Sequence, residues 1–280
     1  MSRENTDIVE FLKVIPEDEE LDYENNREFI DAYLKKVREL EEKGLSKWEI
    51  VQKLQYAFDK FVDSVRGFDR SKHPECWVMA NALAIRQETA ELIDGVAWKH
   101  WKNYDKDIDR EYVLEEIVDI LHFYTSMLIS LNKELKNYIN GDTGDADSIT
   151  MCGVSSVKSV GDCNAGRKTV IEFVLKSEFI SQVAMSIYYV FAKLYGSDSY
   201  VHDSIKEHMM NSINLSLINL AIGMFSVLKH VGLTEDDLYK AYIKKNLKNF
   251  LRQMSGGFRG GSYYAGDNAL DTAMSIINSL

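Results

Sequence analysis

The sequence contains few residues that break helices or cross-link a chain. Its 280 residues include only two prolines, at positions 16 and 74. Because proline ends or bends a helix, this scarcity leaves long stretches free to be helical. The three cysteines, at positions 76, 152 and 163, have no paired spacing. This absence excludes a disulfide framework and the usual zinc patterns, and it favours a reducing compartment.

Positive charge is also scarce. The chain has 33 Lys and Arg against 44 Asp and Glu, a net charge of -11, so it offers no basic surface for general nucleic-acid binding. The apolar stretch around 215–228 is interrupted by Ser216, Asn219 and Ser226, which makes it too polar for a convincing membrane span. The N-terminus is polar and acidic, unlike a signal peptide. We therefore expect a soluble, intracellular protein, cytoplasmic or in an organelle or nucleus, without a membrane or nucleic-acid partner.

The periodic patterns that are present are helical. Apolar residues recur every three or four positions over 27–42, and Ser46 with Glu49 forms a capping box at the start of another helix. That helix is expected to end near Gly67. Strand patterns are nearly absent, so we predict an all-α fold, a multi-helix bundle. The further helices are expected at 77–100, 110–138, 170–195, 203–230 and 234–254.

Two pairs of acidic residues carry the strongest chemical signal, Glu88-x-x-Glu91 and Glu116-x-x-Asp119. The i, i+3 spacing places both members of a pair on one face of a helix. A short link over 103–109 makes the two helices antiparallel neighbours, so the pairs can meet side by side. One such pair alone would more often be two solvated residues. Two pairs among apolar residues are costly to bury unless a cation neutralises them. Ligands that are all oxygen favour Mg²⁺ or Mn²⁺, and four carboxylates can hold two or three such ions, which also bind the phosphates of a substrate. The sequence therefore predicts a metal-dependent enzyme that acts on a phosphate ester.

Residues near the C-terminus suggest phosphate binding. Lys245, Asn249 and Arg252 fall in one sector of the helix over 234–254. The glycine-rich segment that follows contains Arg259, and its backbone N–H groups can point at an anion. We therefore predict a flexible Gly-rich C-terminal lid. At the end of the first acidic helix, Lys99 and Lys102 can also reach a phosphate.

Several of these runs resemble the dimeric all-α dUTPases, which belong to the all-α NTP pyrophosphatase superfamily. The resemblance lies in six motifs: Leu54-Gln55, Glu88-Thr-Ala-Glu91, Trp98-Lys-His-Trp-Lys102, Glu116-Ile-Val-Asp119, Lys245-Asn-Leu-Lys-Asn249-Phe-Leu-Arg252-Gln253, and Gly257-Phe-Arg259-x-Gly261-x-Tyr263.

The resemblance implies a homodimeric enzyme that hydrolyses dUTP to dUMP and pyrophosphate. It implies Mg²⁺ ligation by the four carboxylates, with Glu91 as the base for the attacking water. It also implies substrate contacts by residues in and near the other motifs: Gln55, Asp59, Trp98, Lys99, Lys102, Lys245, Asn246, Asn249, Arg252, Arg259 and Tyr263.

Two alternatives stay open. Asp59 stands where the family has Asn, and its carboxylate can accept a hydrogen bond from a cytosine amino group, so a dCTP or dCTP/dUTP pyrophosphatase competes with the dUTP assignment. A non-catalytic helical regulator is the other candidate. We predict an N-terminal helical extension over 1–45, a catalytic domain over 46–265 with a mobile loop insertion at 140–168, and a tail over 266–280.

Overall fold

The computed structural model describes residues 26–96, 108–139, 165–196, 202–254 and 268–280, with main-chain positions only at 165–169, 257–258 and 261–262. The regular elements among these residues are helices, apart from one small ladder in which β1 (Gly257–Phe258) pairs antiparallel with β2 (Gly261–Ser262). The all-α fold class is confirmed.

The chain divides into two compact units. We call His73–Leu238 the inserted unit, and Met1–Lys72 together with Tyr239–Leu280 the terminal unit. These boundaries differ from the predicted division at 45 and 265, which stays a prediction. Each unit is described by itself.

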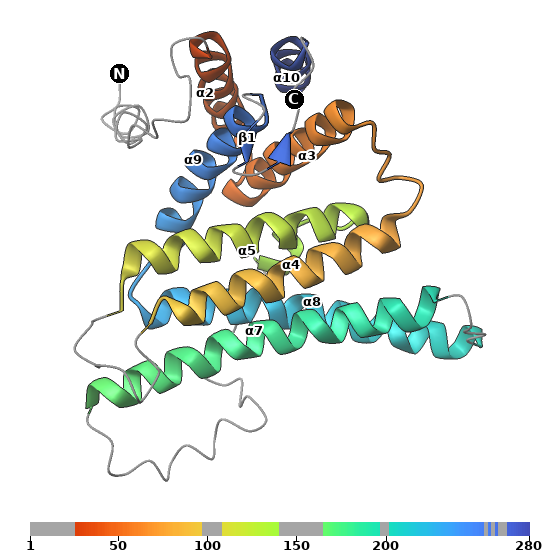
Figure 1. Ribbon diagram of the computed structural model, residues 1–280, viewed down its shortest axis with the longest axis vertical. Helices are drawn as coiled ribbons and strands as arrows, with labels where there is room; N and C mark the ends of the chain where they lie inside the picture. Colours follow the sequence, from red (N-terminus) through yellow and green to blue (C-terminus); the bar gives the residue numbers. More distant parts are fainter. Residues whose placement is uncertain are drawn as a thin grey trace. The chain divides into compact units, whose positions relative to one another are not determined.

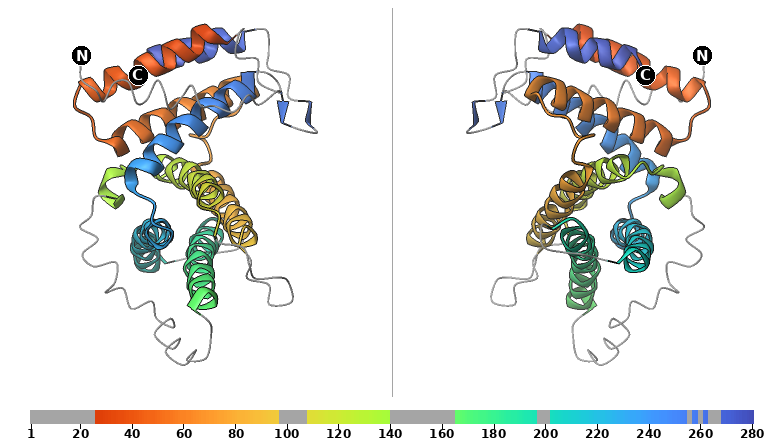
Figure 2. Two further views of the ribbon diagram at one scale, coloured as in Figure 1. Left: turned by 90° about the vertical axis from the view of Figure 1, so that its left-hand side faces the viewer. Right: turned by 90° about the vertical axis from the view of Figure 1, so that its right-hand side faces the viewer.

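The inserted unit is built around four long helices: α4 (Pro74–Asp94), α5 (Arg110–Ser130), α7 (Ala165–Tyr195) and α8 (Asp203–His230). α4 packs against α5 and α7, and α8 packs against α7 and α5. Figure 1 shows the four helices along their length, and Figure 2 shows them nearly end-on, as a bundle. The short α6 (Lys136–Ile139) lies against α8. α7 and α8 approach closely at Gly223 of α8, where an added Cβ would lie only 2.9 Å from Cγ1 of Ile180 in α7.

By length and composition, α8 is the one described helix that could cross a membrane, with 44% of its most apolar stretch buried. A core helix of a soluble bundle passes the same criterion, and α8 packs against three neighbours.

Helix ends differ from the predicted ones for local reasons. α4 begins at Pro74 itself, because the first helical position needs no N–H donor. α5 ends at Ser130 instead of 138: Asn132 adopts φ 53°, and the N–H of Lys133 donates to the carbonyl of Leu128 at 2.9 Å. Asparagine tolerates this left-handed conformation, which closes a helix end. α7 begins at Ala165, so the last residues of the predicted loop are helical, and 140–164 lie outside the described residues.

The terminal unit contains α2 (Arg27–Glu42), α3 (Lys47–Arg66), α9 (Glu235–Met254) from Tyr239 onward, and α10 (Ala269–Asn278). The predicted capping box is confirmed, because Ser46 Oγ accepts from the N–H of Glu49 and the Ser46 N–H donates to Glu49 Oε2. α3 then ends at Gly67, which has φ 67°.

An aromatic cluster holds the terminal unit together. Phe250 of α9 lies at its centre, with ring centroids 5.3 Å from both Phe29 and Phe61 and 5.2 Å from Phe58. Large buried aromatic side chains of this kind contribute strongly to stability.

The segment predicted as a tail contains a helix. α10 packs against both α2 and α3, and buries Ala273 and Ile277. Lys36 of α2 also donates to the carbonyl of Asn278 at 3.3 Å. α10 has only ten residues, which are too few for a helical period to be recognised in the sequence.

Candidate metal centre and a buried polar network

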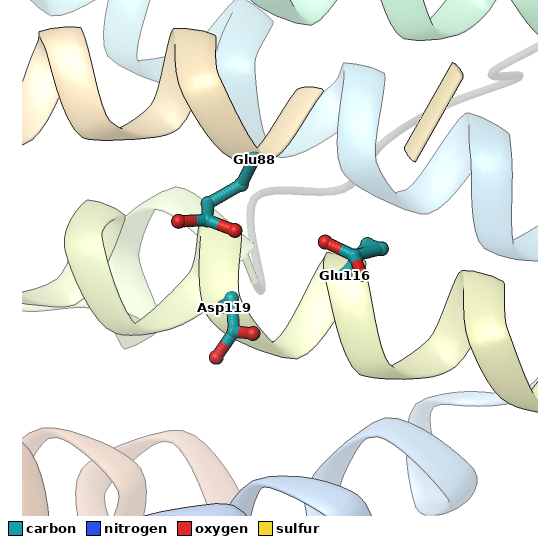
Figure 3. Close-up of side chains that lie close together, drawn as sticks. All are labelled: Glu88, Glu116 and Asp119. Carbon is teal, nitrogen blue, oxygen red and sulfur yellow. The ribbon is translucent and has the colours of Figure 1, made fainter. Parts of the chain in front are cut away.

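Three of the four predicted metal ligands come together in the inserted unit. Glu88 projects from α4 toward Glu116 and Asp119 of α5, and one carboxylate oxygen of each lies within 4.8 Å of the others (Figure 3). Glu116 is buried, with 7% of its surface exposed, whereas Glu88 and Asp119 are half-buried. We call these three residues the carboxylate cluster.

The carboxylate cluster fits a divalent cation. Three like charges at this separation and depth repel one another, and removal from water penalises each charge further. A cation among them reverses both effects. Carboxylate oxygens are the donors that hard cations such as Mg²⁺ and Mn²⁺ prefer. The residues present are therefore suited to a metal, with ligands drawn from two packed helices.

Glu91, the fourth predicted ligand, lies one turn further along α4 and is exposed. Its Oε1 accepts a hydrogen bond from Nε2 of Gln87 at 2.9 Å. It is not among the described acidic groups whose oxygens lie within 4.8 Å of one another. Its roles as ligand and base stay predictions.

Tyr112 adjoins the carboxylate cluster and was not predicted. Its hydroxyl donates to the main-chain carbonyl of Glu91 at 2.9 Å. Burial, and then the Glu116 carboxylate, raises the pKa of Tyr112 to about 12. Its ring fills the space beside Gly95, where an added Cβ would overlap it. The sequence held a signal, because Tyr112 stands four residues before Glu116 and seven before Asp119, on the same helix face.

A second polar group lies inside the terminal unit and is centred on Asp59. Its Oδ1 is 2.9 Å from Nη1 of Arg70 and accepts from Nε2 of Gln55 at 3.0 Å. Arg70 also donates from Nε to Asp63 at 2.7 Å. The Asp59 and Arg70 side chains are 7% and 18% exposed, so this ion pair is largely shielded from solvent.

The hydrogen bonds continue from Gln55 through α9 to α2. Oε1 of Gln55 accepts from the Tyr242 hydroxyl at 2.7 Å, and Tyr242 accepts from Nδ2 of Asn246 at 3.5 Å. Oδ1 of Asn246 accepts in turn from the Tyr33 hydroxyl at 2.9 Å. Burial raises the pKa of Tyr33 and Tyr242 well above the usual range, so both hydroxyls keep the protons that they donate. The six connected residues form what we call the Asp59 network: Tyr33, Gln55, Asp59, Arg70, Tyr242 and Asn246.

The charge of Asp59 sets the direction of this network. An ionised carboxylate only accepts, so the Gln55 amide must turn its NH₂ toward Asp59 and its oxygen toward Tyr242. Tyr242 must then donate to Gln55 and receive from Asn246. With Asn in place of Asp59, either amide orientation of Gln55 would be possible. Arg70, which stabilises the charge, therefore helps to orient two predicted nucleoside contacts, Gln55 and Asn246.

The predicted substrate contacts differ in how deeply they are buried. Gln55 is 3% exposed and Asn246 is 0% exposed, so their polar groups face the Asp59 network. Lys245, Asn249 and Arg252 are half-buried on α9 and share one helical sector. All these substrate contacts stay predictions. The remaining ones lie outside the described residues: Trp98, Lys99, Lys102, Arg259 and Tyr263.

The model of a protein family described as dUTPase matches residues 47–256. The chain belongs to this dUTPase family. The match spans about three quarters of the chain and includes the whole carboxylate cluster and all of the Asp59 network except Tyr33. The predicted family resemblance is therefore confirmed. The prediction that the chain is an enzyme of the nucleoside triphosphate pyrophosphatase type is confirmed as well. The dUTPase family generally uses a divalent metal. None of the curated proteins matches the chain significantly.

Proposed function

We propose that this chain is a Mg²⁺-dependent dUTP diphosphatase that hydrolyses dUTP to dUMP and pyrophosphate. Membership of the dUTPase family supports the reaction class. The observation that carries the metal dependence is the carboxylate cluster, which gathers three acidic side chains from two helices within 4.8 Å.

The chain's own residues have separable roles in this reaction. Glu88, Glu116 and Asp119 hold the cation, with Glu91 completing the set. A bound divalent metal lowers the pKa of water and neutralises phosphate charge. Glu91 accepts the proton of the attacking water, and its exposed position on α4 leaves it open to solvent and substrate. Water attacks phosphorus, and the bond to the pyrophosphate oxygen breaks. Lys245 and Arg252 contact the phosphates and stabilise the charge that develops.

The Asp59 network favours dUTP over dCTP. Oδ1 of Asp59 already receives Arg70 and Gln55, so it is not available to a cytosine amino group. The competing substrate, dCTP, requires the other oxygen of Asp59 to accept the cytosine amino group.

We also propose that the enzyme is a homodimer formed through the inserted unit. Exposed large apolar side chains lie on its helices α4, α7 and α8, including Leu83, Tyr189, Leu215 and Ile218. A contiguous apolar patch is the kind of surface that a partner chain covers. Sedimentation analysis is expected to give twice the chain mass of 32.1 kDa. A monomer at micromolar concentration would contradict this assignment.

The deciding experiment measures pyrophosphate release from dUTP, dCTP and dTTP at equal concentration, with Mg²⁺ and then with EDTA. We expect Mg²⁺-dependent release that is at least about tenfold faster for dUTP, a difference of about 1.4 kcal/mol. A tenfold preference for dCTP would overturn the substrate. No release from any of them would favour the non-catalytic regulator.

The Glu91→Gln variant tests the assigned base. We expect it to abolish hydrolysis while the fold stays intact by circular dichroism. Glu75→Gln in the first turn of the same helix is the control and should retain activity. A Glu91→Gln enzyme as active as the parent would exclude Glu91 as the base.

A further inference from the structure

The side chain of Tyr112, at the start of α5, contacts the end of α4. The main-chain carbonyl of Glu91 accepts from the N–H of Gly95 at 3.0 Å and also from the Tyr112 hydroxyl at 2.9 Å. The Glu91 carbonyl therefore keeps its intrahelical bond and accepts a second one from a side chain of α5, which ties the last turn of α4 to that helix. This turn carries Glu91.

Gly95 makes the contact possible. An added Cβ there would overlap Cε1 and Cδ1 of the Tyr112 ring, so any other residue would displace the ring. Gly95 has an ordinary right-handed helical conformation, which does not itself require glycine. The reason for glycine at this position is therefore the space that the ring occupies.

The same hydroxyl adjoins the carboxylate cluster from the other helix. Tyr112 stands one turn before Glu116 on α5, which places the two side chains on one face of that helix. The ring thus spans from the main chain beneath Glu91 to the most buried carboxylate of the cluster.

We propose that Tyr112, seated on Gly95, is a positioning residue for the cation site. It ties the turn that carries Glu91 to the turn that carries Glu116, and so sets the spacing between the exposed carboxylate and the cluster. The inference rests on the proposed cation site. Groups that orient metal ligands typically change metal affinity about 10–100-fold when they are removed.

The primary test compares direct Mn²⁺ binding, measured by electron paramagnetic resonance, in the parent and in Tyr112→Phe. This variant removes only the hydroxyl and keeps the ring on Gly95. We expect about tenfold weaker binding, with kcat for dUTP reduced and KM little changed. Binding equal to that of the parent would overturn the proposal.

Tyr124→Phe is the matched control. Tyr124 also belongs to α5, and its hydroxyl also donates to a main-chain carbonyl of another helix, that of Leu217 in α8, at 2.8 Å. The control loses an interhelical hydrogen bond of the same type at a place away from the carboxylate cluster. It should lose thermal stability but keep the parent's Mn²⁺ affinity. Equal weakening in both variants would show general loosening of the bundle and contradict the proposal.

A double-mutant cycle tests the role of Gly95. Gly95→Ala alone should weaken Mn²⁺ binding at least as much as Tyr112→Phe. In a Tyr112→Ala background the same change should have no further effect, because no ring remains to be displaced. Additive effects would contradict the proposal.

The binding assay also separates this inference from the proposed function. A parent that binds Mn²⁺ but does not hydrolyse dUTP would refute the substrate and leave the positioning role to be decided by the variants. A parent that binds no Mn²⁺ would refute both the cation site and the role of Tyr112.

Discussion

The two units place acidic side chains inside the protein in opposite ways. In the terminal unit, Asp59 is surrounded by its own partners, Arg70 and Gln55, and belongs to a continuous series of hydrogen bonds. In the inserted unit, three acids are placed together within 4.8 Å. An acid among donors stabilises the fold that surrounds it. Acids placed against one another weaken the fold unless a cation binds, which is a common property of functional sites.

This difference predicts opposite consequences for stability. Removing a charge from the carboxylate cluster relieves repulsion in the metal-free protein. Removing a charge from the Asp59 network leaves a buried partner without its counter-charge.

Glu116→Gln should have the largest effect. We expect activity to fall about 10²–10³-fold, about 3–4 kcal/mol of transition-state stabilisation, because the most buried ligand loses its charge. The metal-free variant should be at least as stable as the parent toward urea. Glu115→Gln, which changes the adjacent exposed residue of α5, should keep activity. A metal-free Glu116→Gln protein less stable by more than about 1 kcal/mol would show that the cluster is not repulsive.

Magnesium itself should have the next largest effect. At about 100 times its dissociation constant, a ligand that binds only the folded state adds about 2.7 kcal/mol of stability. We expect urea unfolding of the parent to shift accordingly and Glu116→Gln to lose most of the shift. Arg70→Met should keep it, because its network does not bind the metal. Loss of the shift in Arg70→Met would contradict the separation of roles between the units.

Arg70→Met should destabilise the protein by about 2 kcal/mol, because a shielded Asp59 carboxylate loses its counter-charge. Lys72→Met is the control, since Lys72 pairs with Asp69 at the surface with 71% and 46% of the side chains exposed. Its effect should stay within about 0.5 kcal/mol. The double variant Arg70→Met with Asp59→Asn should recover part of the loss in urea unfolding. Equal effects of Arg70→Met and Lys72→Met would mean that the Asp59 pair contributes no more than a surface pair.

Tyr242→Phe should have the smallest effect, about 1 kcal/mol, because Gln55 loses a buried donor. Tyr239→Phe, one turn earlier on α9, removes a bond to the half-buried Glu41, which water can replace. We expect it to cost less in thermal unfolding. The reverse order would mean that the Asp59 network is poorly formed in solution.

Local patterns made much of the fold predictable. The helices over 27–42 and 203–230 match the predicted ranges, and the capping box at Ser46 was identified from two residues. The carboxylate cluster was also accessible to sequence, because Glu116 and Asp119 share a face through helical spacing alone. The helical period and the capping box depend on residues at most one or two turns apart, and Glu88 was placed beside Glu116 and Asp119 because the short link over 103–109 predicts antiparallel neighbours.

Contacts between distant residues were not predictable in this way. Asn246 and Tyr33 are separated by 213 positions, and their pairing depends on how α2 and α9 pack. Arg70 reaches Asp59 from the segment after α3, where no helical period applies. The importance of Gly95 depends on a ring that belongs to another helix. The sequence therefore predicted a substrate role for Gln55 and Asp59 but did not reveal the side chains that bind to them within the fold.

The inserted unit is contiguous in sequence, whereas the terminal unit requires residues from both sides of it. A ribosome releases the chain from the N-terminus, and domains generally fold as units during synthesis. The inserted unit is therefore complete before Phe250 has been added to the chain. During that interval Phe29 and Phe61 lack the ring that they pack against. The newly made chain must keep these aromatic side chains from aggregating until its last helices emerge.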